Sequence, residues 1–194
     1  DRNVSLLSAV VMNELTAAED IQNLLPGGVC IIPREWKWGH SREDITYYEI
    51  PVKETVVAAN IPADFRDRIA NMVYVGACAS LFGIPMSIIK LALLDTFNGK
   101  EKPAALNYGV AEMAYKWAQD NLVKVDPFVF EAMDETAGKI LITGNEAAAL
   151  GSLFGGVTVV AWYPITPSTS LVDGILDHRA VRNDPDTGEG TVAI

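Results

Sequence analysis

The sequence predicts an α/β protein, in which an incomplete Rossmann-like layer with a helical C-terminal half is followed by the start of a second α/β domain. Three observations support this class. β-branched apolar runs alternate with a helix pattern over residues 1–59, helix patterns alone occupy residues 63–121, and an order of helix, strand and helix returns after residue 143.

The first elements predicted are a strand and a helix. Residues 4–12 form a continuous apolar run typical of a buried strand. Thr16 and Glu19 have the spacing of a capping box, which predicts a helix from there to Leu25. The Pro-Gly-Gly sequence at 26–28 is expected to end that helix.

Short β-branched runs then predict strands at residues 29–32 and 45–52, with a possible third at 56–59. The order strand, helix, strand favours a βαβ unit and hence a parallel sheet. A strand followed by a glycine-rich turn is missing from this part of the sequence, so we expect the nucleotide-cradling end of the layer to lie before Asp1.

The helical half contains three predicted helices. The first spans about residues 72–81 and is ended by Gly83, and the second spans 86–97 and begins after Pro85. The third spans 104–121, where apolar residues recur at intervals of three and four and so define one helix face.

A change of pattern marks a second unit. Residues 123–136 show no sustained period and are predicted to be a connector. Thr143 to Glu146 have helix-capping chemistry and predict a small-residue helix over 147–154. A strand at 157–162 and a helix at 167–178 should follow, with a turn at residues 183–190.

The two ends of the sequence suggest a piece of a longer polypeptide. The chain opens with Asp1 rather than Met, and residues 191–194 have the alternation of a strand that is just beginning. We therefore expect further chain on both sides.

Composition excludes two classes of partner. The 15 Lys and Arg against 25 Asp and Glu give a net charge of -10, and no basic run is available to neutralise phosphates, so nucleic acid is not an expected partner. The longest apolar runs fall far short of the roughly 20 residues that a membrane helix needs, so a membrane is not expected either.

The cysteines and histidines predict no metal centre. Cys30 and Cys78 are far apart and form no CxxC motif, which favours two core thiols in a reducing cytoplasm. His40 and His178 are isolated from other metal-ligating residues, so surface or helix-end positions are expected for them.

The segment 163–168 is the best candidate for chemistry. It follows a predicted strand, and ligands bind at the carboxyl ends of the strands in open α/β sheets. Pro164 and Pro167 restrict the backbone on both sides of Thr166, which holds a hydroxyl on a stiff turn near the start of a helix. The alternative is that Thr166 merely caps that helix.

The sequence Tyr-Pro-Ile-Thr-Pro-Ser-Thr-Ser at 163–170 resembles the YPITPS motif of 2-oxoacid:ferredoxin oxidoreductases. Residues 144–151 resemble the G-N-x-A-x-A-x-G helix that precedes it in that family. The resemblance implies that Thr166 is a catalytic residue that donates to the 2-oxo group of the substrate. It assigns cofactor contacts to Tyr163, Pro164 and Ile165, and substrate contacts to Thr166 and Ser168.

The rest of the chain fits the same family. Residues 1–122 resemble its γ domain without the N-terminal part, residues 123–136 would be a linker, and residues 137–194 would begin the pyrimidine-type thiamine diphosphate domain. A γ domain fused ahead of the YPITPS domain is typical of α subunits of the two-subunit enzymes, among which the 2-oxoglutarate enzyme is favoured.

The resemblance also implies a reaction and its partners. The whole enzyme would decarboxylate a 2-oxoacid on thiamine diphosphate, reduce ferredoxin and transfer the acyl group to coenzyme A. Mg²⁺, the 4Fe-4S cluster and the residues that bind the diphosphate are expected on a β subunit. The glutamate that protonates the pyrimidine ring of thiamine is expected after Ile194. The fragment alone should be inactive.

Two alternatives remain open at this level. One is a non-catalytic assembly or ligand-binding module. The other is a member of the same family that acts on pyruvate, branched-chain 2-oxoacids or indolepyruvate.

Overall fold

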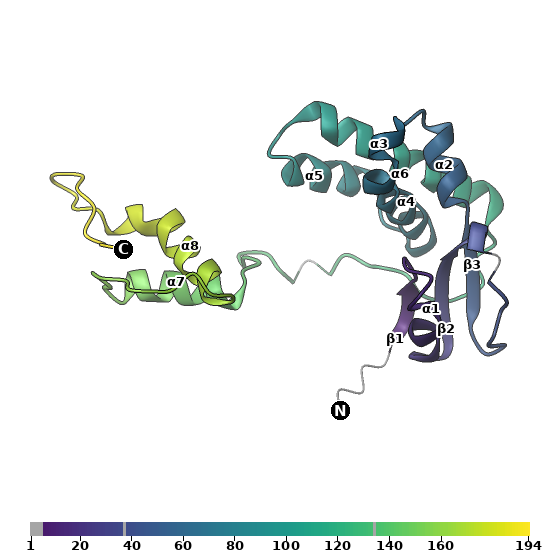
Figure 1. Cartoon of the computed structure of the whole chain (residues 1–194), viewed down its shortest axis with the longest axis horizontal. Coiled ribbons are helices and arrows are strands. Elements are labelled where there is room, and N and C mark those ends of the chain that lie inside the picture. Colours follow the sequence, from purple (N-terminus) through teal and green to yellow (C-terminus); the bar gives the residue numbers. More distant parts are fainter. Residues whose placement is uncertain (1–5, 37, 134) are drawn as a thin grey trace. The chain divides into compact units, whose positions relative to one another are not determined.

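The computed structural model describes residues 6–36, 38–133 and 135–194. The chain divides into two compact units, Asp1–Ala132 and Met133–Ile194 (Figure 1). The first unit combines a parallel sheet with helices, so the predicted α/β class is confirmed.

The sheet of the first unit has three parallel strands in the order β1-β2-β3. Their bounds are Leu6–Val10 for β1, Leu24–Pro33 for β2 and Thr46–Ile50 for β3. Helix α1 (Ala17–Gln22) connects the first two strands. The predicted βαβ unit is therefore present.

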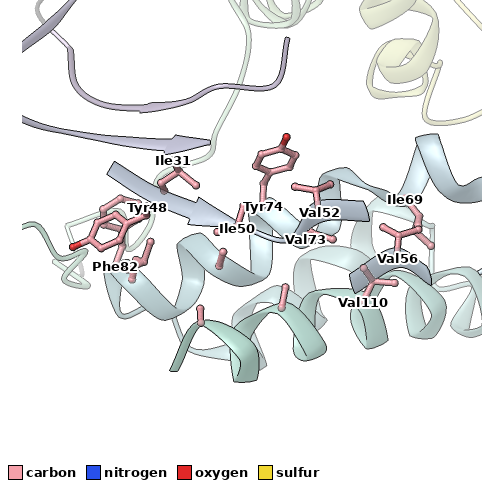
Figure 2. Packing of buried hydrophobic residues seen from close by; sticks show 14 of the residues in the cluster. Ile31, Tyr48, Ile50, Val52, Val56, Ile69, Val73, Tyr74, Phe82 and Val110 are labelled. Carbon is pink, nitrogen blue, oxygen red and sulfur yellow. The ribbon is translucent and has the colours of Figure 1, made fainter. Parts of the chain in front are cut away.

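Alternation along β2 builds two hydrophobic cores. Val29 and Ile31 belong to a cluster with the later helices, whereas Cys30 and Ile32 belong to a cluster with α1. All four side chains are fully buried because successive residues of a strand point to opposite faces and both faces of this sheet are covered. Figure 2 shows Ile31 of β2 beside residues from β3 and the helices.

Five helices follow the sheet: α2 (Val52–Ala58), α3 (Ala63–Ile69), α4 (Asn71–Phe82), α5 (Met86–Thr96) and α6 (Glu101–Asn121). The predicted helices at 72–81, 86–97 and 104–121 correspond to α4, α5 and α6. Gly83 ends α4 in the left-handed conformation, with φ of 75°, as the sequence indicated. Among the described residues, no helix has the length and apolar character to cross a membrane.

The start and end of α1 differ from the prediction. The Thr16 hydroxyl lies 3.1 Å from the Asp20 carboxylate and makes no capping bond, so the predicted capping box with Glu19 is wrong. The helix ends at Gln22 rather than Leu25. The spacing of Thr16 and Glu19 predicted the start of the helix correctly, but it did not predict that the Thr16 hydroxyl bonds to Asp20.

The Pro-Gly-Gly sequence at 26–28 lies within β2 and does not end a helix. Leu6 pairs with Leu24 and Ser8 pairs with Val29, so the residues between Leu24 and Val29 bulge out of the ladder. Turn-forming residues therefore produce a bulge in a strand here. The local sequence alone does not distinguish such a bulge from the end of a helix.

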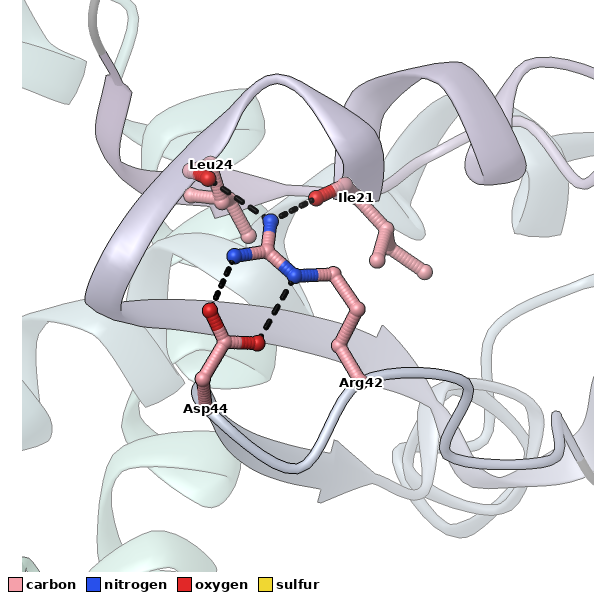
Figure 3. A network of polar contacts seen from close by, with 4 residues as sticks. All are labelled: Ile21, Leu24, Arg42 and Asp44. Carbon is pink, nitrogen blue, oxygen red and sulfur yellow. Dashed lines mark hydrogen bonds and ion pairs between the residues drawn. The ribbon is translucent and has the colours of Figure 1, made fainter.

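Arg42 explains why the chain turns from α1 into β2 at this point (Figure 3). Its guanidinium donates to the backbone oxygens of Ile21, at 2.9 Å, and Leu24, at 2.7 Å. The Asp44 carboxylate holds the other side of the guanidinium at 2.9 and 2.5 Å. One carbonyl at the end of α1 and one at the start of β2 thus share a charged donor from a distant loop.

The possible strand at 56–59 is also a wrong prediction, because residues 56–58 belong to α2. Val52, Thr55 and Val56 are its buried residues, and their spacing of three and four is that of a helix face. The β-branched composition favoured a strand, but packing against the helical half decides the outcome.

The predicted connector at 123–136 is partly docked on the first unit. The Tyr48 hydroxyl donates to the Asp126 carboxylate at 2.6 Å, and Lys124 pairs with the same carboxylate at 2.7 Å. The Phe130 amide donates to the Phe82 carbonyl at 2.9 Å. The first part of the connector therefore belongs to the first unit, whose boundary lies after Ala132.

The second unit contains α7 (Gly144–Phe154) and α8 (Ser168–His178), followed by a 3-10 helix, Arg179–Arg182. A small core forms where these two helices pack, made of Ala149, Leu153 and Ile175. Both predicted helices of this unit are present.

The strand predicted at 157–162 is reduced to a single parallel bridge between Val159 and Ala193. Two backbone bonds of 2.9 Å flank it, from Val160 to Ala193 and from Ala193 to Thr158. An extended strand needs a ladder of partners, and the short segment at 191–194 supplies only this one contact. The predicted turn at 183–190 is confirmed, since the Asp184 carboxylate accepts from two amides of the turn.

Candidate functional site

The residues singled out in the sequence lie together in one turn that leads into α8. This turn comprises residues 163–168, and all six are exposed. Tyr163 and Ile165 are 80% and 65% exposed, which leaves their apolar surface available to a ligand or another chain.

Hydrogen bonds inside the turn brace its backbone. The Ile165 amide donates to the Tyr163 carbonyl at 2.7 Å, and the Ser168 amide donates to the Ile165 carbonyl at 2.8 Å. The Ser168 hydroxyl lies within 3.1 and 2.5 Å of the same two carbonyl oxygens. The hydroxyl hydrogen of Ser168 is thus used within the turn, while its lone pairs remain available.

Thr166 does not act as a helix cap. The N-cap of α8 is Pro167, and no side chain caps this helix. The Thr166 hydroxyl makes no hydrogen bond with any part of the chain that the structure describes. The Thr166 hydroxyl is therefore exposed on a braced turn and is not engaged with the described residues.

Asn145 connects the turn to the helix before it. Its side-chain nitrogen lies 2.9 Å from the Pro167 carbonyl oxygen and 2.7 Å from the Ser170 hydroxyl. The two sequence motifs, separated along the chain, thus meet through one amide. Sequence reasoning placed Asn145 in a motif but missed this contact, because a span of 22 residues leaves no periodic signal.

A capping box fixes the start of α7, so the predicted capping chemistry is present, although the helix begins at Gly144 rather than at Ala147. The Thr143 hydroxyl accepts from the Glu146 amide, and the Glu146 carboxylate accepts from the Thr143 amide. Hydrogen bonds from the Thr143 backbone and hydroxyl hold the pKa of Glu146 below its ordinary value. This carboxylate is charged and engaged in capping, so it is not a candidate proton donor.

The other reactive side chains have structural surroundings. Burial raises the pKa of the Cys30 thiol to about 12 and that of Cys78 to about 11, so both are protonated thiols at neutral pH. His40 lies 3.1 Å from the Glu49 carboxylate and stacks on Tyr47. Within residues 6–36, 38–133 and 135–194, no group of three or more His, Cys, Asp or Glu side chains is arranged to hold a metal ion.

The family model described as pyruvate ferredoxin/flavodoxin oxidoreductase matches residues 4–117, which is more than half of the chain. The chain belongs to this family. The relationship predicted from the two motifs is thereby confirmed, and the matched region is the first unit rather than the turn that suggested it.

Members of the oxidoreductase family are also found among curated relatives. The chain is 29% identical over 177 residues to the α subunit of a 2-oxoacid:ferredoxin oxidoreductase from Saccharolobus solfataricus, covering 90% of this chain and 25% of that protein. A second α subunit, from Aeropyrum pernix, is 25% identical over 139 residues, with coverage of 70% and 22%. The chain spans about a quarter of the length of these relatives.

A solved structure resembles the chain over both units. It is the 2-oxoglutarate:ferredoxin oxidoreductase from Magnetococcus marinus with 2-oxoglutarate, coenzyme A and succinyl-CoA bound. The TM-score is 0.78 and the identity is 26%, and the match covers 97% of this chain and 32% of that one.

Proposed function

We propose that this chain is part of the α subunit of a 2-oxoacid:ferredoxin oxidoreductase, with 2-oxoglutarate as substrate. The first unit would be a γ-like domain without its N-terminal part, and the second would begin the pyrimidine-type thiamine diphosphate domain. The cytoplasmic location remains a prediction from cysteine usage.

The geometry of Thr166 carries this proposal. Its hydroxyl lies on a turn braced by backbone bonds, is exposed, and does not serve the helix that follows. Thr166 stands one position before the N-cap Pro167, so its hydroxyl is not committed to the first turn of α8. A preorganised donor with no partner among the residues that the structure describes is the arrangement expected of a group that stabilises charge on a substrate.

The residues of the turn fit one part of thiamine diphosphate. Tyr163, Pro164 and Ile165 offer exposed apolar surface that suits the flat aminopyrimidine half of the cofactor. A cluster of metal-ligating side chains is absent from the described residues, so the proposal takes the Mg²⁺ site, the diphosphate grip and the iron–sulfur ligands from a β subunit. The thiamine site would thus be shared between two chains.

Thiamine diphosphate, when bound, supplies the carbanion that attacks the 2-oxo carbon and the electron sink for loss of CO₂. Thr166 would donate its hydroxyl hydrogen to the 2-oxo oxygen, on which negative charge grows during the attack. A hydrogen bond from Ser168 to the substrate would require its hydroxyl hydrogen to turn from the Tyr163 and Ile165 carbonyls toward a substrate oxygen, because a 2-oxoacid anion offers only acceptors.

The choice of 2-oxoglutarate is supported by the Magnetococcus marinus enzyme, whose structure contains 2-oxoglutarate, coenzyme A and succinyl-CoA. Coenzyme A is accordingly the proposed acyl acceptor, and ferredoxin the proposed electron acceptor. Pyruvate, branched-chain 2-oxoacids and indolepyruvate are the competing substrates within the family.

The test is reduction of a viologen dye by the complete α subunit that contains this chain, co-expressed with its β subunit. We expect reduction that requires 2-oxoglutarate, coenzyme A and thiamine diphosphate, with kcat/KM for 2-oxoglutarate at least about tenfold above that for pyruvate. A preference for another 2-oxoacid would correct the proposed substrate but would leave the proposed reaction class unchanged.

A parallel arm uses residues 1–194 alone. This chain should not reduce viologen, and its thiamine diphosphate affinity should be weaker than about micromolar in calorimetry. Activity of the isolated chain would contradict a shared site. An assembled complex that reduces viologen with none of these 2-oxoacids would instead favour the non-catalytic module.

A further inference from the structure

The Asn145 side chain makes two hydrogen bonds to residues 22 and 25 positions away in the second unit. It lies in the first turn of α7, and its amide nitrogen reaches the Pro167 carbonyl at 2.9 Å and the Ser170 hydroxyl at 2.7 Å. A carbonyl oxygen can only accept, so the nitrogen, rather than the oxygen, of the amide must face Pro167. Both amide hydrogens are thereby used on the turn that carries Thr166.

The helix that carries Asn145 is held in place at its start and along its side. The capping box between Thr143 and Glu146 closes the first turn of α7 from both sides. Helix α8 then lies very close to α7, since a Cβ added to Gly174 would come within 3.0 Å of the Ala149 Cβ. The helix that presents the amide and the helix that follows the turn therefore have little room to shift.

The contact falls next to the proposed catalytic group. The Pro167 carbonyl belongs to the residue immediately after Thr166, and the Ser170 hydroxyl also lies 3.2 Å from that carbonyl oxygen. Three hydrogen bonds thus join Asn145, Ser170 and the Pro167 carbonyl to one another. The Thr166 hydroxyl takes no part in it.

We propose that Asn145 is a positioning residue that holds the backbone after Thr166, so that the Thr166 hydroxyl stays aimed at the substrate oxygen. This inference rests on the proposed function. Rate depends steeply on the position of such a donor, because a displacement of about 1 Å can cost roughly a hundredfold. The amide does not touch the substrate and acts through Thr166.

The test uses the assembled α and β subunits. Asn145→Ala removes both hydrogen bonds, and Asn145→Asp keeps the shape but turns the donor into an acceptor that repels the Pro167 carbonyl. We expect kcat to fall about tenfold to a hundredfold in each, with KM for the 2-oxoacid changed by less than about threefold. Ser152→Ala is the matched control, because its hydroxyl bonds to Ala148 within α7, and its kcat should stay within about twofold of wild type.

A double variant shows whether the loss of kcat in Asn145→Ala comes from mispositioning of Thr166 or from a wider effect on the active site. If Asn145 acts through Thr166, adding Asn145→Ala to Thr166→Val should cause no further loss of kcat. The inference would be overturned if the two losses of kcat multiply in the double variant. It would also be overturned if Asn145→Ala has wild-type kcat while Thr166→Val is impaired. Neither outcome would contradict the proposed function. Wild-type kcat in Thr166→Val would overturn the proposed function and the inference with it.

Folding is checked by melting temperature and by recovery of the complex. If Asn145→Ala does not assemble, Ser170→Ala serves in its place, because it removes one of the two partners of the amide. A smaller loss of kcat that disappears in the Thr166→Val background would support the inference. A loss that persists in that background would contradict it.

Discussion

Gly76 of α4 lies directly against Ala111 of α6. A Cβ on Gly76 would be 2.0 Å from the Ala111 carbonyl oxygen, a backbone atom that cannot rotate away. These two helices form the most extensive helix contact of the first unit, and their close approach depends on the missing side chain at this position.

Gly76→Ala should therefore destabilise the first unit despite the better helix propensity of alanine. We expect a loss of about 3 kcal/mol, at the upper end of overpacking costs, and a fall in Tm of roughly 6–12 °C. Gly109→Ala on α6 is the control, because nothing lies within 4 Å of its Cβ position, and it should gain about 0.5–1 kcal/mol. Equal Tm values for the two variants would show that the helices separate at little cost.

Thr166→Val tests the hydroxyl directly. Valine keeps the β-branched shape and removes the donor, so kcat of the assembled enzyme should fall by roughly a hundredfold to a thousandfold, or about 2.7–4 kcal/mol of barrier. Thr166→Ser should retain most of the activity. Because Thr166 caps no helix, Tm should be unchanged, and a fall of several degrees with normal kcat would favour a structural role.

Asp126 should make the first unit sensitive to acid. Burial opposes its charge, but hydrogen bonds from Lys124, Tyr48 and the Phe128 amide outweigh burial and hold the pKa of Asp126 below its ordinary value. A lowered folded-state pKa means that the stabilisation is complete above the unfolded value, about 3.9, and is lost as pH falls through the folded value.

Asp126→Asn should accordingly cost about 2–3 kcal/mol at neutral pH, and the gap to wild type should stay constant down to about pH 5 and shrink as the pH falls through and below about 4. Urea unfolding monitored by near-ultraviolet circular dichroism measures this. Asp120→Asn, an exposed aspartate near the end of α6, should stay within about 0.5 kcal/mol of wild type throughout. A gap that does not change with pH would mean that the charge of Asp126 does not contribute.

Limited trypsin digestion should locate the connector between the units. The amide after Lys124 is held, because the Val125 nitrogen donates to the Tyr48 hydroxyl at 3.0 Å. Lys139 is exposed and lies outside any helix or strand. Cleavage after Lys139 should therefore precede cleavage after Lys124, and Tyr48→Phe should bring the two rates closer together. Early cleavage after Lys124 in the wild type would contradict the docking of the connector.

Local signals in the sequence determined most of the elements. The helix spacing in α6, the Gly83 and Pro85 boundaries of α4 and α5, the β-branched run in β2 and the capping residues Thr143 and Glu146 are all local signals. The YPITPS turn was readable for the same reason, since its prolines restrict the backbone of their immediate neighbours. These patterns predicted the class and the candidate turn, whereas the family was predicted from the resemblance of residues 144–151 and 163–170 to its motifs.

Tertiary structure decided what lies between those elements. The passage from α1 into β2 is held by Arg42, which donates to backbone oxygens 21 and 18 residues earlier, and Gly27 in the bulge donates to the Asp44 carbonyl. The docking of the connector depends on Tyr48 and Asp126, which are 78 positions apart. The support of Thr166 depends on Asn145 and its partners, which are 22 and 25 positions away. Hydrogen bonds between distant residues leave no periodicity along the chain, because either partner can be satisfied by water until folding brings the two together.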